Sequence, residues 1–101
     1  MKYPCSAYTE VCGIVYFARM LDKIRLYAAG ELPDAYHTNL GVGVFDAHCC
    51  NLLGVTYPAV SEVAKKESDN EKVLQWCFEN GKKPTAEEIL IWNGFMTKKG
   101  F

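Results

Sequence analysis

An amphipathic pattern between Gly13 and Gly30 is the first long regular feature of this 101-residue chain. Gly30 marks its end, because glycine adopts the left-handed conformation of a helix C-terminus at little cost. We predict a helix over about residues 14–29, whose apolar face any fold of the chain must bury. The residues that define this face recur at steps of three and four, the spacing of one side of an α-helix: Ile14, Phe17, Leu21, Ile24 and Ala28.

The same predicted helix carries a string of charged residues, Arg19, Asp22, Lys23 and Arg25. On a helical projection the first three fall opposite the apolar face, whereas Arg25 falls at its edge. One interpretation is a solvated face with weak ion pairs, worth ~0.2–0.5 kcal/mol each. The other is that a partly buried Arg25 pairs with a carboxylate or binds an anionic ligand, since guanidinium is always charged and donates two parallel hydrogen bonds.

Four further helical segments follow, and local start and stop signals define most of their ends. They are expected at residues 41–53, at 57–66 after a Thr56 cap, from near Asp69 to Gly81, and from Thr85 to about Lys98. Thr85 and Glu88 have the spacing of a capping box. No segment alternates with the period of a strand. The sequence therefore predicts an all-α fold, a compact single-domain bundle of about five helices.

The N-terminal residues 1–12 lack helical periodicity and contain Pro4, so we expect an irregular arm there. Residues 13–101 are expected to form a single helical domain. Half of the residues are apolar or aromatic, which suffices for a core without metal or disulfide support.

Composition excludes several classes of function. The formal net charge is −1 and the basic clusters are short, so no nucleic-acid partner is expected. No apolar run reaches the ~18 residues of a membrane span, and no signal peptide is recognisable, so we expect a cytoplasmic protein without a membrane partner. No Gly-rich phosphate loop or other cofactor motif is present, and no cofactor is predicted. No catalytic motif is recognised.

The five cysteines are an odd number in an expected intracellular setting, which favours free thiols. Cys49 and Cys77 fall on apolar faces and are interpreted as small buried residues. Cys50 lies off the core face of its helix, so it is the thiol expected to be exposed. It could serve as a redox sensor or, with a histidine, as a nucleophile.

The only two histidines are His37 and His48. Together with Asp34 and Asp46 they are the candidates for a divalent-metal site, because imidazole and carboxylate groups suit such ions. Their spacing matches no closed metal motif, and no metal site is predicted. His48 falls at the edge of a core face, where a packing role is the simpler interpretation.

Asn93 is unusual because it shares the inner face of the last helix with Ile89, Trp92 and Met96. A polar amide on such a face needs hydrogen-bond partners. It either bonds to another helix or loop as a structural element, or it lines one polar pocket with Arg25 and Tyr36.

Several short motifs together resemble a known family. They are Gly13, the string from Arg19 to Arg25, Ala29-Gly30, Tyr36, Leu53-Gly54-Val55, the stretch from Asp69 to Trp76, and Thr85 to Ile89 with Trp92-Asn93. The pattern is similar to the bacterial family called domain of unknown function 5069, and the Arg-x-x-Asp-Lys-x-Arg string is its most specific part. The resemblance implies a cytoplasmic single domain and assigns no activity.

Two classes of function follow from these residues. The first is a non-enzymatic binding or protein-interaction module, which could form a homodimer. Thirteen aromatic residues exceed what a small core readily hides, and an exposed aromatic patch would mark an interface. The alternative is a small enzyme or ligand carrier for an anionic small molecule. Its pocket would be formed by Arg19, Asp22, Arg25, Tyr36 and Asn93.

Overall fold

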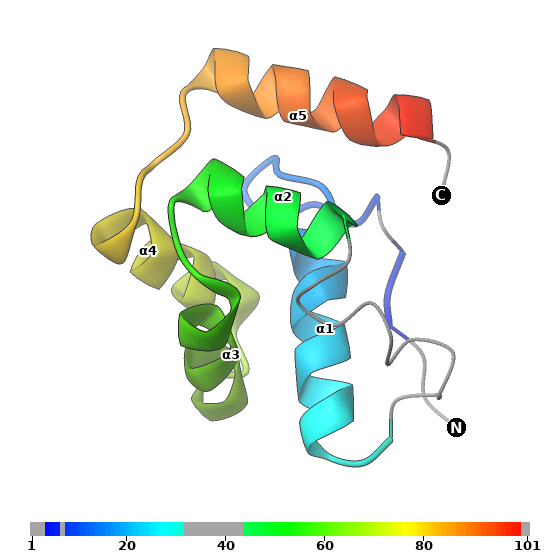
Figure 1. Cartoon of the computed structure of the whole chain (residues 1–101), viewed down its shortest axis with the longest axis vertical. Coiled ribbons are helices and arrows are strands. Elements are labelled where there is room, and N and C mark those ends of the chain that lie inside the picture. The colour runs from blue at the N-terminus through cyan, green and yellow to red at the C-terminus, as the bar shows by residue number, and fades with distance from the viewer. Residues whose placement is uncertain (1–3, 7, 32–43, 100–101) are drawn as a thin grey trace.

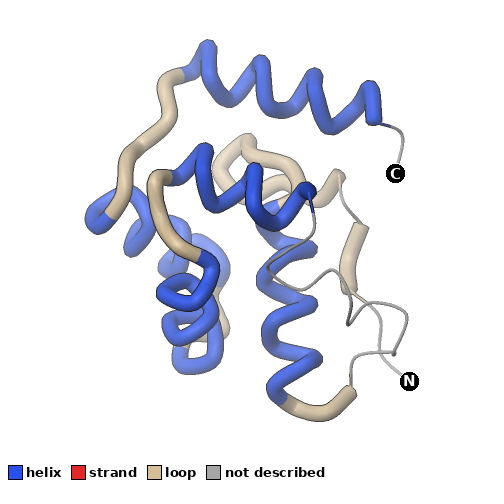
Figure 2. The backbone as a smooth tube through the Cα atoms, viewed as in Figure 1, coloured by secondary structure: helices blue, strands red, loops and turns tan. Residues whose placement is uncertain are grey.

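Helices form nearly all of the regular structure in the computed structural model, which describes residues 4–6, 8–31 and 44–99 (Figures 1 and 2). This part of the chain contains no strand, so the predicted all-α fold is confirmed. None of its helices is both long enough and apolar enough to cross a membrane. The five helices are α1 (Phe17–Ala28), α2 (Val44–Leu53), α3 (Tyr57–Lys66), α4 (Asn70–Asn80) and α5 (Ala86–Lys99).

The helices pack around one apolar core. α1 packs against α3, and α3 also contacts α2 and α4. α5 runs beside α2 along one side of the molecule (Figure 1). Each helix contributes a fully buried side chain to the core, among them Phe17, Leu53, Val60, Leu74 and Met96.

The predicted helix starts are confirmed where side chains cap them. The Thr85 hydroxyl accepts a bond from the Glu88 N–H (3.1 Å), and the Glu88 carboxylate accepts one from the Thr85 N–H (2.9 Å), which completes the capping box. Asp69 caps α4 and Thr56 caps α3 through the N–H groups of Glu71 and Ala59. These caps join residues that are close in sequence, so the sequence alone predicts them correctly.

The start of α1 differs from the prediction. The helix begins at Phe17 rather than near residue 14, because residues 11–14 form a tight turn. Val11 and Ile14 exchange two backbone hydrogen bonds of 3.0 Å. Cys12 (φ 51°) and Gly13 (φ 82°) both have positive φ, as in the two-residue turns that join antiparallel strands. Tyr16 also has a positive φ, of 74°, and helical geometry can begin only after it.

A close backbone contact sets the path from α4 to α5. The Lys82 N–H donates to the Leu53 carbonyl at the end of α2 (2.8 Å). A Cβ atom at Gly81 would lie 2.2 Å from that same oxygen, so only glycine fits there. The contact fixes the start of the connection to α5 against α2, and this brings α5 alongside α2.

Candidate binding groove between α2 and α5

Arg19 and Asp22, two of the predicted ligand-binding residues, bind the backbone of the N-terminal arm. The Asp22 carboxylate accepts a hydrogen bond from the Cys5 N–H (2.9 Å), and Arg19 Nη1 donates to the Cys5 carbonyl (3.1 Å). The neighbouring Pro4 is buried. Both charged side chains therefore hold this part of the arm on α1.

Arg25 binds the junction between α3 and α4. Its guanidinium donates to the carbonyls of Ala64 (3.1 Å) and Glu67 (2.7 Å) and to the side chain of Asn70. A cation suits this place, because the last carbonyls of a helix carry partial negative charge. Partial burial lowers the pKa of Arg25, and the nearby acidic groups oppose that shift. The partners found are two carbonyls and an amide, rather than the carboxylate or anionic ligand of the second interpretation of Arg25.

Asn93 and Trp92 attach α5 to the segment before α1. Asn93 Nδ2 donates to the Gly13 carbonyl (2.8 Å), and its Oδ1 accepts from the Val15 N–H (3.2 Å). Trp92 Nε1 donates to the Val15 carbonyl (3.0 Å). These bonds match the structural interpretation of Asn93, in which the amide pairs with a loop.

The structure does not gather the predicted polar pocket among the residues it describes. Arg25 lies in the last turns of α1 against α3 and α4, whereas Asn93 contacts residues that precede α1. Arg19 and Asp22 meet at Cys5 instead. Tyr36 and His37 lie outside the described residues.

A buried charged network, which was not among the predicted sites, joins α1 to α2. Lys23 Nζ donates to Asp46 Oδ1 (2.8 Å) and to the Tyr16 hydroxyl (2.9 Å), and the hydroxyl donates to the same carboxylate oxygen (2.6 Å). Lys23 is only 4% exposed and Asp46 only 1%. The placement of Lys23 on a solvated face was therefore wrong.

One signal for this network was present in the sequence. Tyr16, Met20 and Lys23 follow one another at steps of four and three, so they share one stripe of the helix. A lysine on an otherwise apolar stripe requires a buried partner. Burial and the charge of Asp46 raise the pKa of the Tyr16 hydroxyl, which keeps it protonated as a hydrogen-bond donor.

The thiol expected to be exposed is buried. Cys50 is 4% exposed, and its Sγ lies 3.9 Å from Met20 Sδ. Burial, with a smaller contribution from Asp46, raises the pKa of Cys50 to about 11. Cys49 and Cys77 are fully buried, as predicted, and burial raises their pKa as well, to about 12 for Cys77. A protonated buried thiol is a poor nucleophile, so Cys50 lacks the character of a redox sensor.

These thiols predict a loss of stability at alkaline pH. In the unfolded chain a thiol has a pKa of 9.0, against about 11 for Cys50 in the fold, so the unfolded state releases its proton first as pH rises. The stabilising effect is complete below pH 9 and is lost as pH rises through the folded values of about 11 and 12. The free energy of unfolding, measured with urea and a reductant from about pH 8 to 10.5, should therefore fall with pH.

Single alanine variants provide the control for this prediction. Cys50→Ala and Cys77→Ala should each make the fall with pH shallower, because each removes one group that titrates differently in the two states. Cys12→Ala changes an exposed cysteine and should leave the slope as in the parent chain. Equal slopes in all four proteins would contradict the assignment.

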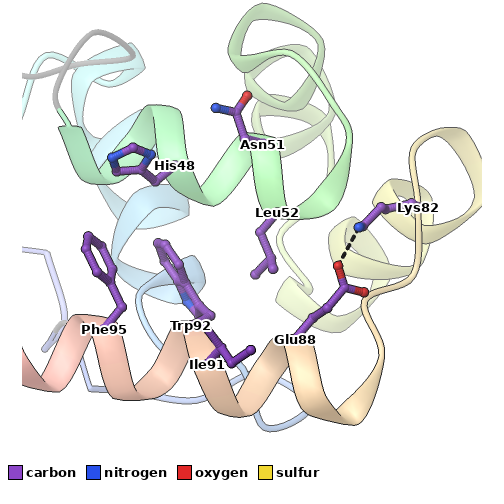
Figure 3. Close-up of a pocket in the computed structure, with 8 residues that line it drawn as sticks. All are labelled: His48, Asn51, Leu52, Lys82, Glu88, Ile91, Trp92 and Phe95. Atoms are coloured by element: carbon purple, nitrogen blue, oxygen red, sulfur yellow. Dashed lines mark hydrogen bonds and ion pairs between the residues drawn. The ribbon is translucent and has the colours of Figure 1, made fainter.

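An apolar groove of about 480 Å³ lies between α2 and α5 (Figure 3). In the close-up, Leu52 points from α2 toward α5, and Trp92 and Phe95 point back toward α2. His48 stands edge-on to the Phe95 ring, with 5.8 Å between ring centroids. The full lining is His48, Asn51, Leu52, Lys82, Glu88, Ile91, Trp92 and Phe95.

The polar groups of the groove lie at its edges. Lys82 Nζ forms an ion pair of 2.6 Å with Glu88 at one end. That hydrogen bond and the Thr85 N–H lower the pKa of Glu88. His48 is exposed at the other end. Within the described segments no group of three or more His, Cys, Asp or Glu side chains is placed to hold a metal ion. The groove therefore offers apolar contact between polar ends.

The outer surface of α5 continues the apolar character of the groove. Leu90 is 71% exposed and Ile91 is 64% exposed, and Ile91 also lines the groove. α5 buries Trp92 and Met96 on its inner side, so this helix has apolar residues on both sides. A helix of this kind in a small domain has an unsatisfied apolar face. The sequence from Ile89 to Trp92 is apolar at every position, so a helix there has apolar residues on more than one face. This feature of the sequence could have indicated the exposed apolar surface.

The observations define a small all-α domain with a wholly buried charged network and an apolar groove beside an exposed helix face. The chain belongs to the family described as "Domain of unknown function (DUF5069)", whose model matches residues 1–101. The matched range includes the N-terminal arm, residues 1–12, which contains none of the motifs on which the resemblance is based. No curated protein and no solved structure matches the chain.

Proposed function

We propose that this domain is a non-enzymatic protein-interaction module that self-associates through the α2–α5 groove and the outer face of α5. One observation carries the proposal: Ile91, which lines the apolar groove, is 64% exposed, and its neighbour Leu90 on α5 is 71% exposed. Soluble monomers rarely expose contiguous apolar patches unless those patches bind something. Aromatic side chains, here Trp92 and Phe95, are also enriched at protein interfaces.

The polar side chains support the same reading. Arg19, Asp22, Arg25 and Asn93 each form hydrogen bonds with main-chain groups. Side chains that stabilise the backbone in this way have fewer hydrogen-bonding positions left for a substrate. The groove is lined mainly by apolar side chains, and Asn51, the polar residue between its two ends, points away from α5 (Figure 3). This lining suits an apolar side chain of a partner better than a charged small molecule.

Sedimentation equilibrium over a wide concentration range tests the proposal. The unmodified chain should associate as its concentration rises. Ile91→Lys should weaken association at least about tenfold, because it places a charge in an apolar contact. The substitution should leave the thermal midpoint within a few degrees, since Ile91 is exposed in the monomer.

Tyr27→Lys is the matched control, because Tyr27 is also a large exposed side chain (55%) but lies at the far end of α1. This variant should associate like the parent chain. A protein that remains monomeric up to millimolar concentration, or equal effects of the two variants, would rule out self-association through α5.

A further inference from the structure

The outer stripe of α5 has a charge pattern that complements itself. Glu87, Ile91, Gly94 and Lys98 follow at steps of four, three and four, so they form one line along the helix. All four are exposed. The line begins with an acidic residue, ends with a basic residue and has an apolar centre flanked by Leu90 and Phe95.

We infer that two copies of the chain pair through this stripe as an antiparallel α5–α5 contact with two-fold symmetry. This inference rests on the proposed function and specifies the geometry of that self-association. A two-fold axis midway between residues 92 and 93 places Glu87 of one copy opposite Lys98 of the other, twice. The same axis places Ile91 opposite Gly94 of the second copy.

The surroundings of Gly94 favour this geometry. Nothing lies within 4 Å of where its Cβ would stand, so the surface is open there. Glycine lowers the stability of a helix interior, but it allows a second helix to approach closely. The exposed Ile91 of one copy can fill the space above Gly94 of the other.

The charge pattern also selects the antiparallel arrangement over the parallel one. Parallel helices would place Glu87 against Glu87 and Lys98 against Lys98, and like charges at an interface repel. From Glu87 to Lys98 the contact covers about three helical turns. An interface of that size is small, so association should be weak and fast.

Charge reversal tests the arrangement. Glu87→Lys and Lys98→Glu should each weaken self-association roughly tenfold at low salt, because each replaces two attractive pairs by two repulsive ones. The double variant Glu87→Lys/Lys98→Glu should associate like the parent chain. An equimolar mixture of the two single variants should also regain association, because it forms two Lys–Glu pairs between unlike copies.

Two control variants separate these effects from changes in helix stability. Glu71→Lys reverses an acidic residue in the first turn of α4, and Lys66→Glu reverses a basic residue in the last turn of α3. Each reverses a charge near a helix terminus, as Glu87→Lys and Lys98→Glu do on α5, and neither should alter self-association.

The outcomes distinguish the inference from the proposed function. A parent chain that never associates overturns both. Association that Ile91→Lys weakens but charge reversal leaves unchanged overturns only the antiparallel pairing. Loss of association in both single variants without recovery in the double variant also overturns it, since the charges then do not face each other.

Discussion

Asp46→Ala should lower the free energy of unfolding by about 3–5 kcal/mol. The substitution removes the carboxylate that accepts bonds from both Lys23 and Tyr16, and it leaves an ammonium group that is only 4% exposed without its partner. An unpaired buried charge is far more costly than a missing hydrogen bond. Urea unfolding followed by circular dichroism measures the effect, with a smaller loss expected for Tyr16→Phe, which removes only a hydroxyl.

Replacing the whole network provides the control. Tyr16→Phe/Lys23→Met/Asp46→Leu removes all three polar side chains of the network, and most of the lost stability should return, because apolar residues of similar size often replace a buried ion pair without loss. This variant is informative even where Asp46→Ala fails to fold. If the triple variant is less stable than Asp46→Ala, the network contributes more to the stability of the fold than the mutual neutralisation of its buried charges.

The parts of the fold that the sequence predicted depend on local chemistry. The capping box of Thr85 and Glu88 and the cap by Asp69 involve residues two or three positions apart, so their partners are evident from spacing alone. The glycine after α1 is similar, since Gly30 has a φ of 72° as a helix C-terminus requires. The number and type of helices followed from these signals and from apolar periodicity.

The parts that could not be predicted depend on contacts between distant segments. Lys23 meets Asp46 on another helix, and a helical projection of α1 alone cannot show that partner. The late start of α1 results from the turn at residues 11–14, which α5 binds through Asn93, eighty residues after Gly13. Cys50 is buried because α1 covers it with Met20, although it lies off the face that its own helix periodicity defined.

The second large effect is expected at Trp92, which attaches α5 to the rest of the domain. Trp92→Ala should lower the free energy of unfolding by about 3–5 kcal/mol, because a buried aromatic ring and its hydrogen bond to the Val15 carbonyl are both lost. Trp92→Phe keeps a ring that can pack near Phe95 and should lose less, about 1–2 kcal/mol. Urea unfolding at a concentration where the chain is monomeric measures both.

Leu90→Ala is the matched control on the same helix. Leu90 is 71% exposed, so its truncation should change the stability of the monomer by less than about 0.5 kcal/mol. The two neighbouring positions thus separate the two sides of α5: Trp92 should affect folding, whereas Leu90 flanks the stripe that should affect association. If Leu90→Ala destabilised the monomer as much as Trp92→Ala, the outer face of α5 would be part of the core, and the surface proposed for a second copy would not exist.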